Sequence, residues 1–469
     1  MGYLRGEDRR QASLLPAALE DYVAADALVR VVDEFIASLD FAALGFQRSA
    51  PAGVGAPGYD PRDMLRLYLY GYLNEIRSSR RLERECGRNI ELMWLMGRLA
   101  PDFKTIADFR KDNGPALIGA CRAFVLFCRK QGLVGGHTVA VDGSKFRAAA
   151  SPRKMTGHRE IEAEKARIDG RVAGYLAALD EEDSHEEAVA DKAAIVEALE
   201  ALRNRRTELD MMAAELEDTE QTVLVETEPD ARPMGKGKGS KPPSYNVQTA
   251  VDSENKLIIH HAVTTEATDA RLLHEMAAGA KAMLGAKTLK VVADAGYSSG
   301  AQAAACEADG IEPCVPAKQS PNTRGDFYDR SAFTYDAQSD AYTCPAGRKL
   351  LRKSFDKKKQ SVRYQAQDCS ACPHKAQCTD AERRTVKRSV YEDDLKRMNA
   401  RVASDPGLMR LRQAIVEHPF GTIKRMMGGR FLLRGVEKVT AETALAVLAY
   451  NLLRVANILG PRNLTAKLA

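Results

Sequence analysis

Three acidic residues in three different settings constrain the fold of this chain more than any other feature. Asp142 lies inside an apolar, strand-like run (HTVAVDGSKF), Asp294 ends another (LKVVADAGYS), and Glu417 lies on a helix far downstream (RQAIVEHPFGTIKR). An acid inside a buried run costs free energy unless it is paired or bound to a metal ion. Carboxylates that converge from such settings can hold two divalent cations, which together support phosphoryl transfer.

Each acid also has an ordinary interpretation. Asp142 could lie in a turn or on an exposed face of its strand, and Asp294 could cap a turn or a helix. A lone glutamate on a helix, such as Glu417, is usually a solvated surface residue. Only the three together, in this order along the chain, favour a shared site.

The order of predicted elements gives these acids a place in a fold. Strands are predicted at 137–146, 245–252, 256–264, 288–293 and 311–316, with a helix capped by Thr268-Asp269 before the fourth and another at 298–307 before the fifth. This order matches the RNase-H-like arrangement, a mixed sheet flanked by helices. In it the first acid falls within the first strand, the second at the end of the fourth, and the third on a helix beyond the fifth.

Length and composition predict a multidomain α/β protein. With 469 residues, about two to four domains are expected. A hydrophobic fraction of 45% can build real cores, and a net charge of +5 says little about partners. No run of about 18 apolar residues indicates a membrane span, and the polar N-terminus has no signal-peptide core. We therefore expect a cytoplasmic protein with no membrane partner.

The predicted division has five parts. They are a helical N-terminal domain for DNA-end binding (1–135), an RNase-H-like core (136–150 and 241–318), a charged helical insert with a basic loop (151–240), a cysteine-rich basic insert (319–395) and C-terminal helices with the third acid (396–469). In the first part, Asp60 with Pro61 predicts a helix start. Thr105-Ile106-Ala107-Asp108 resembles a capping box that opens another helix.

Arginines recur in the N-terminal part at helical spacing. A helix across this segment would place five of them on one stripe: Arg77, Arg80, Arg81, Arg84 and Arg88. Such a stripe suits phosphate contacts by a helix-turn-helix-like reader of DNA. The alternative is a solvated face partly neutralised by neighbouring glutamates, and the stripe alone does not decide between the two.

The insert between the first two strands predicts a helical arm. Residues 157–219 are charged, with apolar positions in two halves around 181–184, which favours an antiparallel helical hairpin that serves as a spacer or interaction arm. Residues 228–244 are rich in Pro, Gly and Lys and predict a mobile loop.

Nine cysteines in a cytoplasmic chain do not indicate a disulfide framework. Five lie in apolar or helical stretches and are expected in the core: Cys86, Cys121, Cys128, Cys306 and Cys314. The other four can supply tetrahedral, structural Zn²⁺, and His374 could replace one of them; these are Cys344, Cys369, Cys372 and Cys378. Four reduced thiols without metal are the alternative.

Two further segments carry expectations of their own. The basic stretch 348–363, with Tyr364, predicts either a contact to the DNA backbone or simply an exposed charged hairpin. The helix of Glu417 is expected to begin near Pro406 and to be interrupted or kinked at Pro419.

Taken with the motifs IRSSRRLEREC, PDFKTIADFRK, VDGSKFRA, YNVQTAVD, VVADAGYSS and IVEHPFGTIKR, the chain resembles a DDE-type transposase of a bacterial insertion sequence, in the branch with a YREK-like third motif. The resemblance covers nearly the full length. It implies that Asp142, Asp294 and Glu417 are catalytic acids that bind two Mg²⁺ (or Mn²⁺) ions per active site, with Lys424 as the lysine of the motif.

The resemblance also implies partners and a reaction. The protein would cut at terminal inverted repeats by attack of water, free a 3′-hydroxyl and join it to target DNA, as a nucleoid-associated homodimer or larger assembly. Lys145, Arg147 and Arg412 are expected to contact DNA. The chain departs from the motif, because Gln413 and Arg410 stand where it has arginine and tyrosine. A metal-dependent nuclease that does not join, or an inactive DNA-binding protein on the same fold, are the alternatives.

Overall fold

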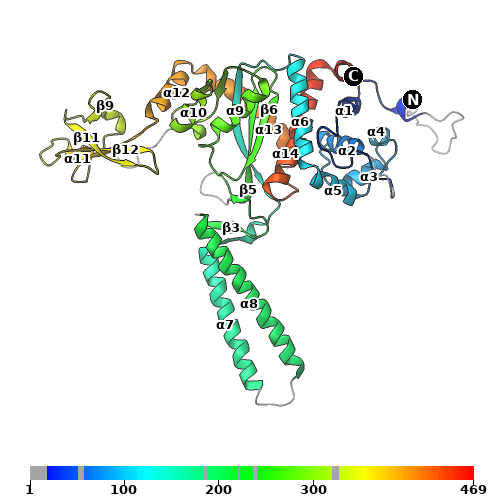
Figure 1. Cartoon of the computed structure of the whole chain (residues 1–469), viewed down its shortest axis with the longest axis horizontal. Coiled ribbons are helices and arrows are strands. Elements are labelled where there is room, and N and C mark those ends of the chain that lie inside the picture. Colours follow the sequence, from blue (N-terminus) through cyan, green and yellow to red (C-terminus); the bar gives the residue numbers. More distant parts are fainter. Residues whose placement is uncertain (1–17, 51–56, 183–188, 220, 236–240, 319–326) are drawn as a thin grey trace, which may run out of the picture.

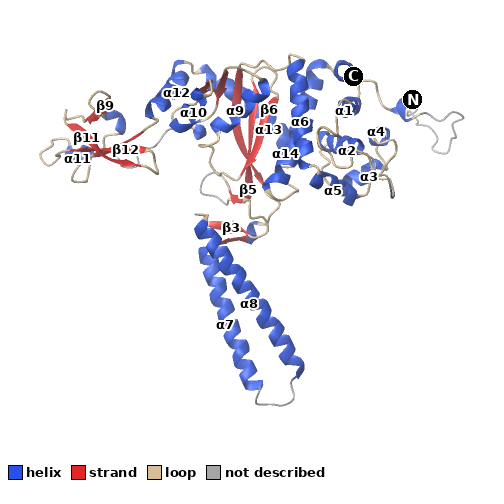
Figure 2. Ribbon diagram, in the orientation of Figure 1, coloured by secondary structure: helices blue, strands red, loops and turns tan. Residues whose placement is uncertain are grey.

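The structure is a computed structural model that describes residues 18–50, 57–182, 189–219, 221–235, 241–318 and 327–469. It is a mixed α/β protein with several parts. Figure 2 shows the strands of the largest sheet at the centre with helices around it, a long helical arm to one side and a smaller sheet at one end.

The central sheet has the strand order β4-β5-β1-β7-β8, with β6 also paired to β5. Its strands are β1 (Thr138–Arg147), β4 (Arg232–Pro233), β5 (Pro243–Asp252), β6 (Ile258–Thr264), β7 (Leu289–Val292) and β8 (Ile311–Cys314). β5 runs antiparallel to β1 and β6, whereas β1, β7 and β8 are parallel. The predicted strands and the predicted hairpin of β5 and β6 are confirmed.

Helices from the middle and the C-terminal part of the chain flank this sheet or pack on the helices that do. They include α9 (Leu273–Leu284), α10 (Gly300–Ala308), α12 (Glu392–Ser404), α13 (Gly407–Met427), α14 (Val436–Leu459) and α15 (Pro461–Leu468). α14 is long and apolar enough to cross a membrane, but 83% of its apolar window is buried inside the protein, as expected of a core helix. It packs against α6 on one side and β6 on another.

The N-terminal part is helical, as predicted. After the 3-10 turn η1 (Leu19–Tyr22) it comprises α1 (Leu28–Ala37), α2 (Pro61–Leu73), α3 (Ser79–Cys86), α4 (Ile90–Leu95), α5 (Phe103–Asp112) and α6 (Gly114–Lys130). Asp60 caps α2 by accepting a hydrogen bond from the Arg62 N–H, which confirms the predicted start. The capping box predicted at Thr105 is wrong, because Asp102 caps α5 one turn earlier through the Lys104 and Thr105 N–H groups.

The predicted arginine stripe is also wrong as one continuous helix face. α3 spans only Ser79–Cys86, so Arg77 and Arg88 lie outside it. Arg77 pairs instead with Glu442 of α14, whose side chain is fully buried. The physical reason is that this buried carboxylate needs a cationic partner, and Arg77 supplies it.

The predicted helical hairpin is confirmed. β2 (Met155–Gly157) and β3 (Val223–Val225) pair at its base, and α7 (His158–Glu182) and α8 (Val189–Asp218) extend from them. Figure 1 shows this arm projecting away from the rest of the molecule. It has an apolar cluster of its own, which includes Ile161, Ile168 and Leu209. The predicted loop 228–244 contains β4 and the start of β5, and its residues 236–240 lie outside the described residues.

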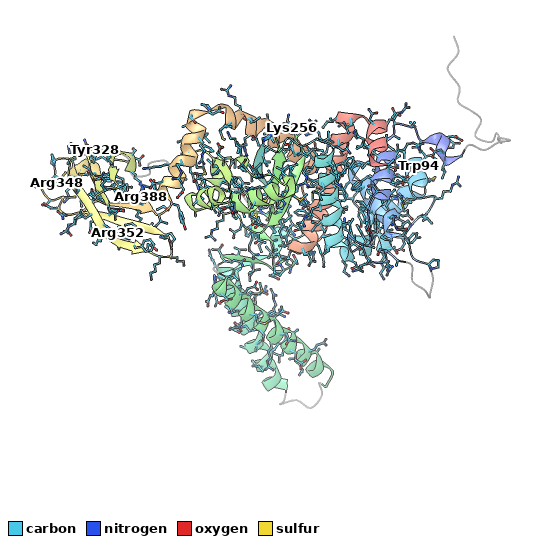
Figure 3. All side chains as sticks on the ribbon, turned by 45° about the horizontal axis from the view of Figure 1, so that its top comes forward. Trp94, Lys256, Tyr328, Arg348, Arg352 and Arg388 are labelled. Carbon is cyan, nitrogen blue, oxygen red and sulfur yellow. The ribbon has the colours of Figure 1, made fainter. Side chains whose placement is uncertain are left out.

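The cysteine-bearing part forms a second sheet with the order β13-β12-β11-β10-β9. Its elements are η4 (Arg330–Ala332), β9 (Thr334–Asp336), β10 (Ala341–Thr343), β11 (Lys349–Asp356), β12 (Ser361–Ala366), α11 (Lys375–Cys378) and β13 (Thr385–Ser389). Figure 3 marks this cysteine-bearing part with the labels Tyr328, Arg348, Arg352 and Arg388. Tyr364 is buried and donates a hydrogen bond to Asp340, so it does not share the surface of this hairpin with the basic residues.

Candidate active site

The three predicted acids line one pocket of about 590 Å³. They come from three elements: Asp142 from β1, Asp294 from the turn after β7, and Glu417 from α13. Other residues of the same pocket are Lys145, Asp269, Arg412, Gln413, Phe420 and Lys424. Segments that are more than a hundred residues apart in the chain therefore meet here.

The sheet places the two aspartates side by side. β7 pairs with β1 only at residues 138–140, so β1 runs on past its parallel neighbour and carries Asp142 beyond the end of β7. Asp294 follows β7 directly and caps the short turn η3 (Ala295–Tyr297), where its carboxylate accepts a hydrogen bond of 2.8 Å from the Gly296 N–H. Because Asp142 lies just past the paired part of β1 and Asp294 just past the parallel strand β7, both acids lie at the same edge of this strand pair.

Arg412 of α13 binds both aspartates. One of its terminal nitrogens lies 2.9 Å from Asp142 Oδ1 and 3.7 Å from Asp294 Oδ2. Burial raises the pKa of Asp142, while Arg412 opposes this shift and the charge of Asp294 adds to it. Arg412 was predicted to contact DNA; in this structure its side chain is 18% exposed and faces the acids.

Glu417 and Lys424 lie on the same side of α13. The Gln413 amide donates a hydrogen bond of 2.7 Å to Glu417, one turn along the helix. Lys424 is exposed, and its ammonium lies 5.9 Å from the centre of the Phe146 ring on β1. The predicted interruption of this helix is wrong, because α13 continues through Pro419. Pro419, Phe420 and Ile423 are buried, and this burial offsets the backbone hydrogen bond that the proline cannot make.

The donor set suits hard divalent cations, which prefer carboxylate oxygens. Asp142 and Asp294 already share one positively charged nitrogen, so both are aimed at a common position. Over the residues that the structure describes, no group of three or more His, Cys, Asp or Glu side chains is arranged closely enough to hold a metal ion. Glu417 and Asp269 are the further oxygen donors in the pocket.

Asp269 is the pocket residue that sequence reasoning missed. Thr268-Asp269 was predicted to cap a helix, but α9 begins at Leu273 with Leu272 as its cap residue, so this prediction is wrong. The carboxylate of Asp269 turns into the pocket instead. A signal was present in the sequence, because Asn246 and Gln248 alternate in a segment predicted to be a strand, and buried amides need a polar partner.

The residues predicted to contact DNA lie in two places. Lys145 is in the pocket, and Arg147, two residues on, is exposed beside it. In the N-terminal part, Arg81 and Arg84 are exposed, Arg80 stacks on Phe103, and Arg88 pairs with Glu85. These positions do not test DNA binding, so each of the expected DNA contacts stays a prediction.

The four predicted zinc ligands are brought together. Cys344, Cys369, Cys372 and Cys378 all line one small cavity of about 20 Å³ in the cysteine-bearing sheet. Burial raises the pKa of the Cys378 thiol, and the other three cysteines add to this shift. The five cysteines predicted for the core are buried.

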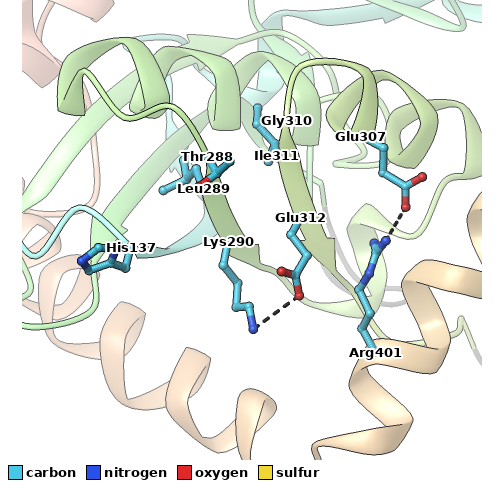
Figure 4. A pocket seen from close by; sticks show the side chains of 9 residues that line it. All are labelled: His137, Thr288, Leu289, Lys290, Glu307, Gly310, Ile311, Glu312 and Arg401. Carbon is cyan, nitrogen blue, oxygen red and sulfur yellow. Dashed lines mark hydrogen bonds and ion pairs between the residues drawn. The ribbon is translucent and has the colours of Figure 1, made fainter.

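A second pocket lies at the opposite end of the parallel strands (Figure 4). Its charged side chains pair with one another: Lys290 with Glu312 at 3.3 Å, and Arg401 with Glu307 at 2.5 Å. These pairs join β7 to β8 and α12 to α10.

Comparison with known proteins gives two family matches. A family described as a transposase domain (DUF772) matches residues 17–112, and a family described as a transposase DDE domain matches residues 343–456. The second match includes Glu417 and Lys424. No curated protein matches the chain.

Proposed function

The chain is a DDE-type transposase of an insertion-sequence family, and on this premise we propose that the pocket of Asp142, Asp294 and Glu417 cuts the ends of the element and joins them to target DNA. The single observation that carries the proposal is that these three acids, from β1, β7 and α13, line one pocket. The strand order and directions of the central sheet support an RNase-H-like core.

Asp142, Asp294 and Glu417 would hold two divalent cations. When bound, such ions activate an attacking hydroxyl and stabilise the leaving oxygen of a phosphodiester. Asp142 supplies the most enclosed donor of the three acids, and Asp294 and Glu417 supply donors at the more exposed side of the pocket. Arg412 holds the two aspartates together by neutralising them.

Cationic side chains around the pocket would bind and orient the DNA. Lys145 and Lys424 lie within the pocket, and Arg147 extends from it along β1. The exposed arginines Arg81 and Arg84 are our candidates for contacts to the terminal repeats. Pairing of two element ends would bring two copies of the chain together. Because its substrate is chromosomal DNA, we expect the protein in the cytoplasm, on the nucleoid.

The four clustered cysteines would hold a structural Zn²⁺. Four thiolates satisfy tetrahedral zinc without an open position, so this ion would stabilise the small sheet and take no part in the chemistry. We expect about one zinc per chain. Metal analysis of the purified wild type and of Cys372→Ser measures it, with Cys314→Ser, a buried cysteine outside the cluster, as the matched control. A wild type without zinc would leave four reduced thiols as the correct interpretation.

The test of the main proposal compares the wild type with Asp294→Asn on labelled DNA that carries the element's ends, with Mg²⁺ or EDTA. Cleavage should need Mg²⁺ and should be lost in Asp294→Asn, and joined products should appear with target DNA. Asp218→Asn, an exposed acid at the end of α8, is the matched control and should cleave like the wild type.

The remaining outcomes separate the alternatives. Cleavage without joined products would favour a metal-dependent nuclease. If the wild type and Asp294→Asn bind DNA equally and neither cleaves verified ends, the protein is better explained as a DNA-binding protein without activity. That outcome would overturn the proposal.

A further inference from the structure

A buried hydrogen-bond network lies beneath the pocket, and Asp269 is its centre. Asp269 Oδ1 accepts hydrogen bonds from Asn246 Nδ2 at 2.7 Å and Gln248 Nε2 at 2.9 Å, and it lies 3.3 Å from Lys145 Nζ. Three donors from two strands therefore converge on one oxygen. A residue that only begins a helix would not be expected to collect them.

The two amides come from the same face of β5. Side chains alternate along a strand, so Asn246 and Gln248 point the same way. They are 0% and 1% exposed, and buried amides cost free energy unless they are hydrogen-bonded. In the register of the sheet, Asn246 lies opposite Lys145 and Gln248 lies opposite Gly143. The network thus lies next to the segment of β1 that carries Asp142.

The packing at Gly143 shows how close this network is to the acids. A Cβ atom at Gly143 would lie 2.1 Å from Gln248 Nε2 and 3.0 Å from Asp269 Oδ1. Glycine at this position lets the network pack directly on the strand. On the other side, the Tyr297 hydroxyl donates a hydrogen bond to Gln248 Oε1, and Tyr297 ends the turn that Asp294 caps.

We propose that Asp269 is a positioning residue of the transposition reaction: the amide pair holds its carboxylate between the segments that carry Asp142 and Asp294, and this carboxylate fixes Lys145 in the pocket. This inference rests on the proposed function for its effect on catalysis, but the contacts that it describes do not. The side chains of Lys145 and Asp269 are 28% and 24% exposed, so this ion pair is partly shielded from water. Lys145 is then held towards the pocket rather than left to sample solvent.

The first experiment measures the reaction. Asp269→Ala should lower the rate of end cleavage at saturating DNA by about 10- to 100-fold, as expected when a residue that orients the site is lost. The affinity for Mn²⁺, measured by electron paramagnetic resonance, should change by less than about threefold, because Asp269 acts through Lys145 and not as a ligand. Asp269→Asn keeps an acceptor for the amides but loses the charge that attracts Lys145. Its cleavage rate should therefore lie between the rates of the wild type and of Asp269→Ala.

A double-mutant cycle tests the link to Lys145. If Asp269 acts through Lys145, then the variant that combines Asp269→Ala and Lys145→Ala should be no slower than the slower single variant. If the losses of cleavage rate in the two single variants multiply in the double variant, the proposal is overturned. A loss of Mn²⁺ affinity of more than about tenfold in Asp269→Ala would also overturn it, because Asp269 would then be a metal ligand. Wild-type rates in Asp269→Ala would overturn it as well.

A measurement that needs no cleavage separates this inference from the proposed function. Labelling of Lys145 by an amine-reactive reagent, read by mass spectrometry, should be faster in Asp269→Ala than in the wild type, while Lys256, in the connection between β5 and β6, keeps its rate. Unchanged labelling of Lys145 would overturn the positioning role even if the enzyme were inactive. Glu275→Ala, an exposed acid of α9, is the matched control, and thermal melting of every variant shows that it is folded.

Discussion

At the scale of single residues, Arg412 and a divalent cation would compete for the same two carboxylates. Arg412 neutralises Asp142 and Asp294 in this structure. Arg412→Ala leaves these acids unneutralised, so the variant should bind Mg²⁺ more tightly, with half-saturation at a concentration lower by on the order of tenfold. Its cleavage rate should nevertheless fall, because the acids are less well held. The Mg²⁺ dependence of the melting temperature measures the affinity without any need for activity.

Arg410→Ala is the matched control for this prediction, because Arg410 is exposed on the same helix and does not line the pocket. Its melting temperature should depend on Mg²⁺ as that of the wild type does. Equal or weaker Mg²⁺ binding by Arg412→Ala would show that the arginine does not compete with the ion.

Residues also show what the sequence could and could not predict. Asp142 and Asp294 could be predicted because the order of the strands and the motifs around them placed both acids in one fold. Asp269 was missed because an aspartate before a helix has a common local explanation, although the nearby amides of Asn246 and Gln248 were a signal. The ion pairs of Arg412 with Asp142 and Asp294 could not be predicted, because they depend on how α13 packs against the sheet. Local sequence patterns do not describe that packing.

At the scale of elements, the helical arm has an apolar cluster of its own, so we expect the central sheet to fold without it. Its base is the antiparallel pair of β2 and β3, in which Gly157 lies opposite Val223. Replacing 158–222 by Asn-Gly would join these strands by a two-residue turn. The deletion variant also carries Leu224→Thr, because the arm covers this apolar side chain in the full chain. The melting temperature of the main body should differ from that of the wild type by less than about 5 °C.

Ile168→Asp in the full chain is the matched control, since it puts a charge into the apolar cluster of the arm alone. It too should leave the main transition in place, as measured by circular dichroism. A large loss of cooperativity in the deletion variant would show that the arm supports the sheet.

Elements were predicted best where local pattern and packing agree. α7 and α8 follow from their composition, and the strands follow from their apolar runs. α13 was predicted to be interrupted or kinked at Pro419 because a proline inside a helix costs about 3 kcal/mol. Burial of the neighbouring Phe420 and Ile423 against the sheet offsets this cost, and only the tertiary structure supplies that burial.

At the scale of the whole molecule, one apolar core joins the N-terminal helices to the central sheet. The core contains Val32 of α1, Val139 of β1 and Leu448 of α14, whereas the cysteine-bearing sheet and the arm have separate clusters. Across this shared core, Arg77 pairs with Glu442, which also accepts hydrogen bonds from the Leu432 and Leu433 N–H groups. The N-terminal helices and the sheet should therefore unfold together.

Arg77→Ala tests this coupling, because it leaves a buried carboxylate without its closest cation. The free energy of unfolding should fall by about 3 kcal/mol, and the main transition should move as a whole to lower temperature without splitting, as followed by calorimetry. Arg84→Ala, an exposed arginine of α3, should change the melting temperature little. Two separate transitions in Arg77→Ala would mean that the N-terminal helices fold as an independent unit and that Arg77 does not couple them to the sheet.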